Sequence, residues 1–313
     1  MKIIKSQCTV SLLALGLGLA VNGYSQTFLT NGLVAYYTFN GNANDASGNG
    51  NNGTVYGGVT LTADRFGLPN AAYDFDGSTG YIDVPENALL NALTTNFTLS
   101  AWIWQAGSST NGYRILDKCP AGEPGGWTFD TLNCSSGTGH RLRLQGAADN
   151  SCNVNGQTDY SLMQWHHVVA TVSGTTGTLY LDGSATGSGD VGTIPANTLD
   201  VYLGMAHPGR GAGFWFNGII DDVRIYNRAL SPDDVAVLYE MESGPRVDLI
   251  KAVKPSFRGL TLTTNYQLQV SSDLKTWTNQ SSPFTATNIN MTYPQYFDVD
   301  NWNTLFFRLQ ATP

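Results

Sequence analysis

Long apolar runs and charged residues are scarce in this chain of 313 residues. The apolar run at 12–21 is too short to cross a bilayer comfortably, and no later stretch approaches the length that a spanning helix needs, so we expect no membrane span. Only 13% of the residues are charged, and the net charge is −8. An acidic chain repels polyanions, which argues against a nucleic acid as its partner.

Three motifs of common enzymes are also missing. No Gly-x-Ser-x-Gly elbow is present, which argues against ester hydrolysis by a serine triad. No glycine-rich phosphate loop opens a helix, so nothing indicates nucleotide binding. His166 and His167 are adjacent in a predicted strand. Their rings then point to opposite faces and cannot bind one zinc ion together.

The first 25 residues have the composition of a secretory signal peptide. Lys2 and Lys5 precede the apolar run, and Gly23-Tyr24-Ser25 follows it with small residues at a cleavage position. We therefore predict residues 1–25 to be a signal peptide of a secreted or cell-surface bacterial protein. Cleavage would change the net charge from −8 to −10, because the segment holds two lysines and no acid.

Cysteine is rare, and an odd number remains after the predicted cleavage: Cys119, Cys134 and Cys152. The segments 127–133 and 141–147 are predicted to form an antiparallel hairpin. The start of its first strand and the end of its second lie side by side, which favours a Cys119–Cys152 disulfide. Cys134 paired with either of the others is the alternative, because spacing alone does not fix connectivity.

What the sequence has in abundance is glycine, at 35 residues, together with short alternating apolar stretches. This combination predicts many short strands joined by turns, and hence an all-β protein. The predicted strands are 33–39, two within 72–84 about an Asp-Gly turn, 97–104, 127–133, 141–147, 165–172, 178–181, 199–204 and 219–226. Ser231-Pro232-Asp233-Asp234 predicts a helix start, and the tail has strands of its own at 266–270, 284–286 and 305–309.

The strand at 219–226 carries the most informative acid of the chain. If it alternates regularly, Asp221 shares a face with Val223 and Ile225, which are apolar. A carboxylate in line with core residues is costly unless a cation or several donors neutralise it. We therefore expect a structural rather than a catalytic acid, and a bound Ca²⁺ would supply the charge.

Five segments in order resemble the laminin-G-like jelly-roll domains of the concanavalin-A-like lectin and glucanase superfamily. The segments read GLVAYYTFNGNANDASGNGNNG, YDFDGSTGYIDV, FTLSAWIW, WHHVVATVSGTTGTLYLDG and FNGIIDDVRIYNRALS. The resemblance covers residues 27–242 and implies a sandwich of two antiparallel sheets, one of them concave. Residues 246–313, beyond the boundary at Ser243-Gly244-Pro245, resemble the small β modules found at the C-terminus of many exported bacterial proteins.

The resemblance also implies a structural calcium, held between the N-terminal loop and the last strand. By motif its ligands would be Asp221 first, then Asp45, Asp76 and Asn40. The oxygen-rich loop 40–53 suits such an ion. A plain turn-rich loop is the alternative for any single residue in it.

Glucanases of this superfamily place two carboxylates on one strand face in a Glu-x-Asp-x-x-Glu motif. After the predicted signal peptide this chain has four glutamates, none in that pattern: Glu86, Glu123, Glu240 and Glu242. We therefore expect no catalytic residue.

Sugar binding has support from aromatic side chains, because sugars stack on aromatic faces and hydrogen-bond to amide, carboxylate and guanidinium groups. Trp102 and Trp104 share a strand face and could form a platform, with Trp127, Arg210 and Trp215 at a rim. The alternative is that Trp102 packs in the core and Trp215 covers an edge. The sequence thus predicts an exported, non-catalytic module that binds a polysaccharide or other glycan. An adhesion module for a cell-surface protein, or a glycoside hydrolase, are the alternatives.

Overall fold

The computed structural model describes residues 27–107, 113–119, 125–133, 140–146, 153–208, 214–244, 252–293, 297–298 and 306–312. The predicted signal peptide, Cys134, Cys152 and Arg210 lie outside these residues. The chain forms two compact units, and the boundary between them in the sequence lies between Gly244 and Pro245. The units are described separately below.

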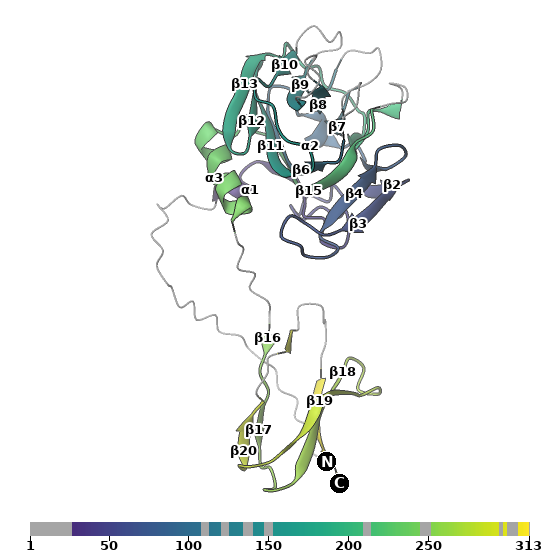
Figure 1. The fold of residues 1–313 in the computed structure, drawn as a ribbon, viewed down its shortest axis with the longest axis vertical. Coiled ribbons are helices and arrows are strands. Elements are labelled where there is room, and N and C mark those ends of the chain that lie inside the picture. Colours follow the sequence, from purple (N-terminus) through teal and green to yellow (C-terminus); the bar gives the residue numbers. More distant parts are fainter. Residues whose placement is uncertain are drawn as a thin grey trace. The chain divides into compact units, whose positions relative to one another are not determined.

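The first unit is a sandwich of two antiparallel sheets (Figure 1). The eight-stranded sheet contains, in order, β13 (Ser184–Asp190), β12 (Thr176–Leu181), β11 (Trp165–Ser173), β6 (Asn96–Gln105), β15 (Asn217–Tyr226), β4 (Ala72–Asp76) and β3 (Val59–Thr62), with β1 (Leu33–Tyr37) also paired to β15. The seven-stranded sheet contains β10 (Asn153–Asn155), β9 (His140–Gln145), β8 (Thr128–Asn133), β7 (Arg114–Asp117), β14 (Val201–Leu203), β5 (Tyr81–Val84) and β2 (Thr54–Tyr56).

The core fills the space between the sheets with alternate residues from each strand. Ile103 of β6 and Ile82 of β5 are fully buried in it, as are Phe129 of β8 and Trp127 just before that strand. This is the packing of a sandwich, in which inward apolar residues alternate with outward ones. The predicted all-β jelly-roll class is confirmed.

β15 departs from the regular alternation that the sequence predicts. Its first residues pair with β4 and its last with β1, and its register against β6 shifts between Asp221 and Arg224. Asp222 has φ 45°, the left-handed conformation of a bulge residue. The bulge puts Ile220 and Val223 in the core and turns both acids away from it, so the prediction that Asp221 lies on the core face is wrong.

The two Asp-Gly turns have different roles. Asp182-Gly183 joins β12 to β13 in a hairpin, and both residues have positive φ (48° and 78°), as a type I′ turn requires. Asp76-Gly77 instead carries the chain out of β4 in the larger sheet and into β5 in the smaller one. The two strands flanking that turn therefore do not pair with each other.

The outer face of the eight-stranded sheet is covered by helix α3 (Pro232–Ser243), which begins at Ser231 with a complete capping box, as predicted. Leu238 of α3 packs with Val169 of β11 and Tyr226 of β15 in a second apolar cluster. Two four-residue helices, α1 (Thr27–Thr30) and α2 (Ala88–Asn91), complete the unit. No described helix of the chain has the length and apolarity that a membrane crossing needs.

The second unit consists of short antiparallel sheets around a small core. Its strands are β16 (Ala252–Val253), β17 (Ser256–Arg258), β18 (Asn265–Ser271), β19 (Thr278–Thr285), β20 (Asn290–Thr292), β21 (Phe297–Asp298) and β22 (Phe306–Thr312). Sheets form from β16–β21, β17–β20 and β19–β18–β22. Phe257, Leu268 and Tyr293 are the main buried residues of its core.

Trp127 tests how far the core tolerates loss of volume. Its side chain is fully buried, its ring lies 5.8 Å from that of Phe97, and its Nε1–H has no hydrogen-bond partner in the described part of the chain. We expect Trp127→Ala to lower the free energy of unfolding by about 3–5 kcal/mol. Trp127→Phe should cost less, because it keeps more of the buried volume than alanine does and removes the unpaired N–H. Denaturant unfolding of both variants checks this, and equal losses would contradict it.

Candidate functional site

A row of polar residues crosses the outer face of the seven-stranded sheet. Residues that face each other across neighbouring strands lie on the same side of a sheet. The register places one polar residue of each strand directly opposite the next: Thr54, Asp83, Tyr202, Asp117, Thr128, Gln145 and Asn153. Their neighbours along the strands, such as Ile82 and Leu203, point into the core. The row therefore forms a polar face opposite the core.

Half of this face, over β7, β8 and β9, is closed by internal ion pairs. Arg143 binds Asp130 with two hydrogen bonds, from Nε to Oδ1 at 2.8 Å and from Nη2 to Oδ2 at 2.5 Å. Arg114 also pairs with Asp130, whose side chain is fully buried. Asp117 accepts hydrogen bonds from the Thr128 hydroxyl and, at 2.8 Å, from the backbone N–H of His207. These charges are neutralised inside the protein.

The other half, over β2, β5 and β14, carries four aromatic rings that we call the aromatic platform: Tyr56, Tyr81, Tyr202 and Trp215. The rings of Tyr56 and Tyr81 are stacked at 4.9 Å. Tyr81 also lies 6.0 Å from Tyr202 and 6.2 Å from Trp215. Tyr202 is only 8% exposed, whereas Tyr56 is 43% exposed. The platform is therefore anchored at one end and open to solvent at the other.

Two turns fix the spacing of the platform. Gly57 follows Tyr56 with φ +62°, and a Cβ there would lie 2.0 Å from the carbonyl oxygen of Thr79, so only glycine fits. In the facing turn Asp76 accepts backbone N–H bonds from Ser78, Thr79 and Gly80 at 2.8–2.9 Å. Partial burial opposes ionisation of Asp76, but these hydrogen bonds outweigh it and lower the pKa of the carboxyl. Asp76 thus orders the turn that leads into Tyr81.

Two carboxylates border the platform. Burial and the nearby Asp200 raise the pKa of Asp83, and its Oδ1 is buried without a hydrogen-bond partner among the described residues. Burial, with Asp83 and Asp200 nearby, raises the pKa of Tyr202 to about 12. An aromatic surface edged by hydrogen-bond acceptors is the result.

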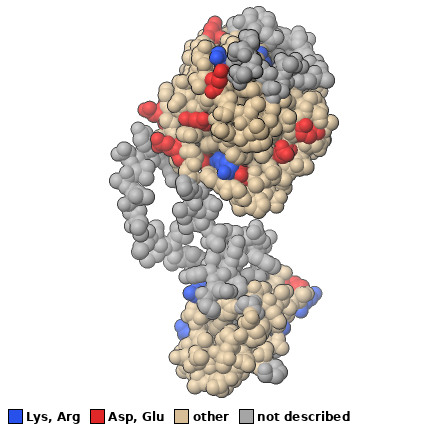
Figure 2. All heavy atoms as spheres, in the orientation of Figure 1, with Lys and Arg blue, Asp and Glu red and all other residues tan. Residues whose placement is uncertain are grey.

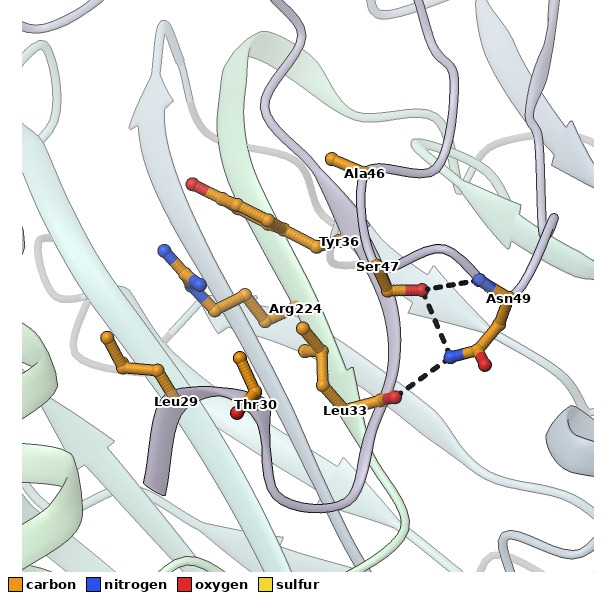
Figure 3. A pocket seen from close by; sticks show the side chains of 8 residues that line it. All are labelled: Leu29, Thr30, Leu33, Tyr36, Ala46, Ser47, Asn49 and Arg224. Atoms are coloured by element: carbon orange, nitrogen blue, oxygen red, sulfur yellow. Dashed lines mark hydrogen bonds between the residues drawn. The ribbon is translucent and has the colours of Figure 1, made fainter. Parts of the chain in front are cut away.

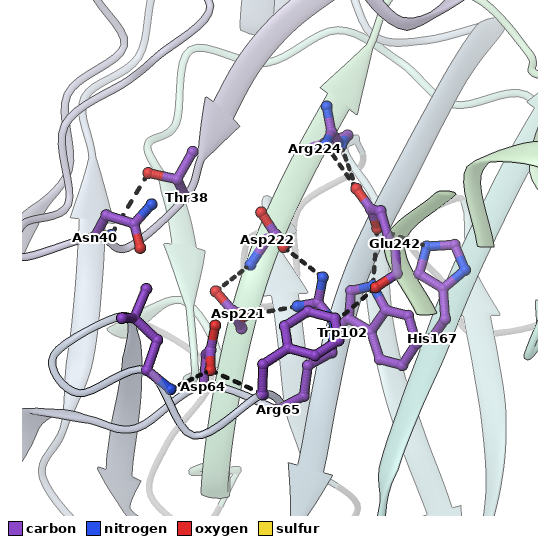
Figure 4. Close-up of polar contacts among 12 residues, drawn as sticks. Thr38, Asn40, Asp64, Arg65, Trp102, His167, Asp221, Asp222, Arg224 and Glu242 are labelled. Carbon is purple, nitrogen blue, oxygen red and sulfur yellow. Dashed lines mark hydrogen bonds and ion pairs between the residues drawn. The ribbon is translucent and has the colours of Figure 1, made fainter. Parts of the chain in front are cut away.

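The opposite face of the sandwich carries a buried charge layer under α3 (Figure 4). Arg65, from the loop after β3, donates from Nη1 to Asp221 and from Nη2 to Asp222, both at 2.8 Å. All three side chains are at most 4% exposed. Burial and the charge of Asp222 raise the pKa of Asp221, while Arg65 acts in the opposite direction. The cation that meets Asp221 in this structure is therefore a side chain.

Glu242, at the end of α3, joins the same layer. Its Oε1 accepts from Arg224 Nε at 2.9 Å, and its Oε2 accepts from Trp102 Nε1 at 2.8 Å. The guanidinium of Arg65 lies 4.5 Å from the Trp102 ring and donates to the backbone carbonyl of Glu242 at 3.1 Å. The layer thus ties the helix end to the sheet beneath it.

The four predicted calcium ligands do not form one coordination shell. Asp221 is paired to Arg65. Asp45 accepts from Tyr36, Ser47 and Asn51 within its own loop, and Asp76 orders the platform turn. The side chain of Asn40 is exposed. No group of three or more His, Cys, Asp or Glu residues able to hold a metal occurs in the described residues. These four residues therefore do not fit a binding site for a single calcium ion.

The predicted sugar-binding residues are spread over the molecule. Trp102 is 4% exposed beneath α3 and Trp127 is in the core, which corrects their assignment to a ligand surface because neither ring is accessible. Trp104 is half-buried on the outer face of the larger sheet. Trp215 belongs to the platform, whereas Arg210 lies outside the described residues.

The predicted disulfide lies partly outside the described residues. Cys119 is buried near the end of β7, and Cys152 is not described. The pairing stays a prediction.

A pocket of about 540 Å³ lies beside the N-terminal loop (Figure 3). Its lining is Leu29, Thr30, Leu33, Tyr36, Ala46, Ser47, Asn49 and Arg224. Its polar groups serve the fold. Ser47 and Asn49 bind backbone carbonyls of β1, and Arg224 pairs with Glu242. Several polar groups of the pocket are therefore engaged in contacts that hold the fold together.

A family model described as the concanavalin A-like lectin/glucanases superfamily, of the laminin G type, matches residues 76–236, about half of the chain. The chain belongs to this superfamily. A comparison with curated proteins gives no match.

Solved structures share the fold at low sequence identity. Domain 4 of AbnA, a GH43 extracellular arabinanase from Geobacillus stearothermophilus, was solved with arabinotriose. It is 21% identical with a TM-score of 0.51, and the match covers 66% of this chain and 98% of that one. The binding domain of botulinum neurotoxin DC, solved with SialylT, is 17% identical with a TM-score of 0.52, over 77% of this chain and 57% of that one. The same kind of domain solved with rat synaptotagmin II is 17% identical with a TM-score of 0.53, over 76% and 57%. These likenesses establish the fold alone.

Arg65 is predicted to be essential to the charge layer. Arg65→Met would leave Asp221 and Asp222 buried without a cation, which should lower the free energy of unfolding by about 3–5 kcal/mol. Arg141→Met, at the exposed Arg141–Asp159 pair, is the control and should cost less than about 1 kcal/mol. Denaturant unfolding measures both. The wild-type melting temperature should be the same in Ca²⁺ and in EGTA, and a drop on chelation would contradict the role given to Arg65.

The buried side chain of His167 leads us to expect that the protein loses folding stability as the pH falls. Its ring is fully buried, with Nε2 2.9 Å from the Ser100 hydroxyl, and burial lowers its pKa to about 3. Below pH 6.5 the unfolded chain therefore takes up a proton that the folded protein does not. Stability from this group is complete above pH 6.5 and falls by about 2 kcal/mol between pH 7 and pH 5. Urea unfolding of His167→Gln should show a pH-dependent loss smaller by that amount, and an unchanged loss would refute the assignment.

Proposed function

We propose that this protein is an exported, non-catalytic module that binds carbohydrate on the open half of its seven-stranded sheet. The observation that supports the proposal is the aromatic platform, a set of four rings in contact, edged by the half-buried carboxylates of Asp83 and Asp200. Sugar rings present apolar C–H faces and a rim of hydroxyl groups. A surface that pairs rings with acceptors suits both parts of that chemistry.

The platform is also rigid, which favours affinity. Gly57 and the Asp76 turn hold Tyr56 and Tyr81 at a fixed spacing, and tyrosine has few rotatable bonds to order. Less conformational entropy is then lost when a ligand binds. A ligand would therefore bind to side chains that are already in position before it arrives.

A binding role without catalysis is supported by how the acids are used. Glu242 is engaged by Arg224 and Trp102, and Asp130 is enclosed between two arginines. The solved structures that share the fold include two binding domains and a domain of an arabinanase. Export rests on the predicted signal peptide.

Two other functions would give different results. An adhesion module would bind proteins without glycan selectivity. A glycoside hydrolase would release reducing sugar from the glycan that it binds, and replacing the acids at the platform would abolish that release.

Removal of platform rings provides the direct test. On an array of neutral plant and microbial polysaccharides, the wild-type protein should bind at least one member. Tyr81→Ala and Tyr56→Ala should each weaken that binding about tenfold, because loss of an aromatic anchor typically costs more than about 1 kcal/mol. Trp104→Ala removes a half-buried ring from the other sheet and is the matched control. If the tyrosine variants bind as the wild type does, the platform is not the site.

A further inference from the structure

We infer that the aromatic platform selects uncharged glycans and rejects those that carry carboxylate or sulfate groups. The inference rests on the proposed function and deepens it, because it names the class of ligand. The inference is drawn from the charged side chains around the platform, whereas the proposed function is drawn from its aromatic rings.

The carboxylates at the platform have no ionic partner in the described structure. Neither Asp83 nor Asp200 is in a salt bridge among the described residues. Asp200 instead accepts a hydrogen bond from the backbone N–H of Glu86 at 2.7 Å. Glu86 adds a third negative charge nearby.

The cations closest to this acidic group are turned inward. Burial lowers the pKa of Lys118, whereas the nearby charges of Glu86 and Asp200 act in the opposite direction, so Lys118 partly offsets these two acids. Its side chain is nevertheless only 2% exposed, and its Nζ donates to Asn91 Oδ1 at 2.9 Å and to the carbonyl of Leu199. Arg114 and Arg143 on the closed half of the face both bind Asp130. In the part of the chain that the structure describes, no lysine or arginine is thus presented beside the platform rings to pair with an anion.

Asp83 and Asp200 are half-buried and bring two negative charges to the edge of the platform, although Oδ1 of Asp83 itself is covered. A sugar hydroxyl can donate a hydrogen bond to an accessible carboxylate oxygen, and a bond to a charged acceptor is stronger than one between neutral groups. A ligand carboxylate or sulfate can only accept, and would add a like charge. Two unit charges about 6 Å away, even at the dielectric constant of water, oppose binding by about tenfold in affinity.

The net negative charge of the chain favours the same class of ligand. The chain carries 24 acidic residues against 16 lysines and arginines. Acidic side chains are scattered over the face of the first unit that Figure 2 shows. The long-range field therefore also disfavours the approach of polyanions.

The test compares glycans that differ only in charge. The full mature protein is titrated with three pairs of probes: methyl-esterified galacturonan and galacturonan, xylan and glucuronoxylan, and lactosamine glycans without and with sialic acid. For each backbone that binds, the neutral member should bind at least about tenfold more tightly at low salt. The gap should narrow in 1 M NaCl, because salt screens the repulsion.

Substitutions of Asp83 and Asp200 test whether these two acids cause the selectivity. Asp83→Asn combined with Asp200→Asn should bring the affinities of each pair together, mainly by improving the acidic member. Asp74→Asn combined with Asp190→Asn removes the same charge from exposed positions on the other sheet and should leave the gap intact. Equal or tighter binding of acidic glycans by the wild type overturns the inference, as does a gap that survives the double variant. If no probe binds and no neutral array member binds, or if Tyr81→Ala has no effect on binding, the proposed function fails and the inference fails with it.

Discussion

Each strand of the sandwich can bury only every second side chain, and the rest of the structure depends on this constraint. In β5 the core takes Ile82 and Val84, so Tyr81 and Asp83 must point the other way. In β14 the burial of Val201 and Leu203 turns Tyr202 outward beside them. Three of the four platform rings, those of Tyr56, Tyr81 and Tyr202, are therefore placed by strands whose alternate residues pack the core, whereas Trp215 precedes β15.

Among the register shifts of the described strands, the one with the largest effect on charge lies where β15 exchanges β4 for β1 as its neighbour. The bulge at Asp221 and Asp222 places two carboxylates on the outer face, where a cation must compensate them because they are buried under the helix. Arg65 meets this need and connects three parts of the chain, namely the loop after β3, the last strand of the sandwich and the end of α3. The two faces of the sandwich are thus specialised differently. One holds the fold closed through buried charge, and the other remains open.

Sequence periodicity and turn chemistry predicted many of the strands and the cap of α3, and the resemblance to laminin-G-like domains implied the two-sheet sandwich. The alternating stretch around Ile103 and the cap at Ser231 are local signals, and both elements lie where they were expected. The bulge could not be predicted, because one extra residue reverses every later side chain without changing the composition. Arg65 lies 156 residues before Asp221, and no local pattern connects them.

The proposed binding surface was harder to predict than the fold, because tryptophan is the stronger signal in a sequence but two of the selected tryptophans are buried. Tyr81 and Tyr202 lie on opposite faces from their apolar neighbours, and that alternation was the available clue. Their meeting depends on the order of β2, β5 and β14 in the sheet, which is set by long-range pairing. The sequence therefore indicated an aromatic surface, but it did not indicate which rings the order of the strands brings together.

The position of β2 at the end of its sheet has a further consequence. Among the described strands none follows it in the order, and all three of its residues are exposed, so the described part of the sheet provides no wall beyond Tyr56. A closed tunnel would require a polymer to enter by one of its ends. A surface that ends at a free margin can instead be laid against the middle of a long polymer, with both of its ends far away.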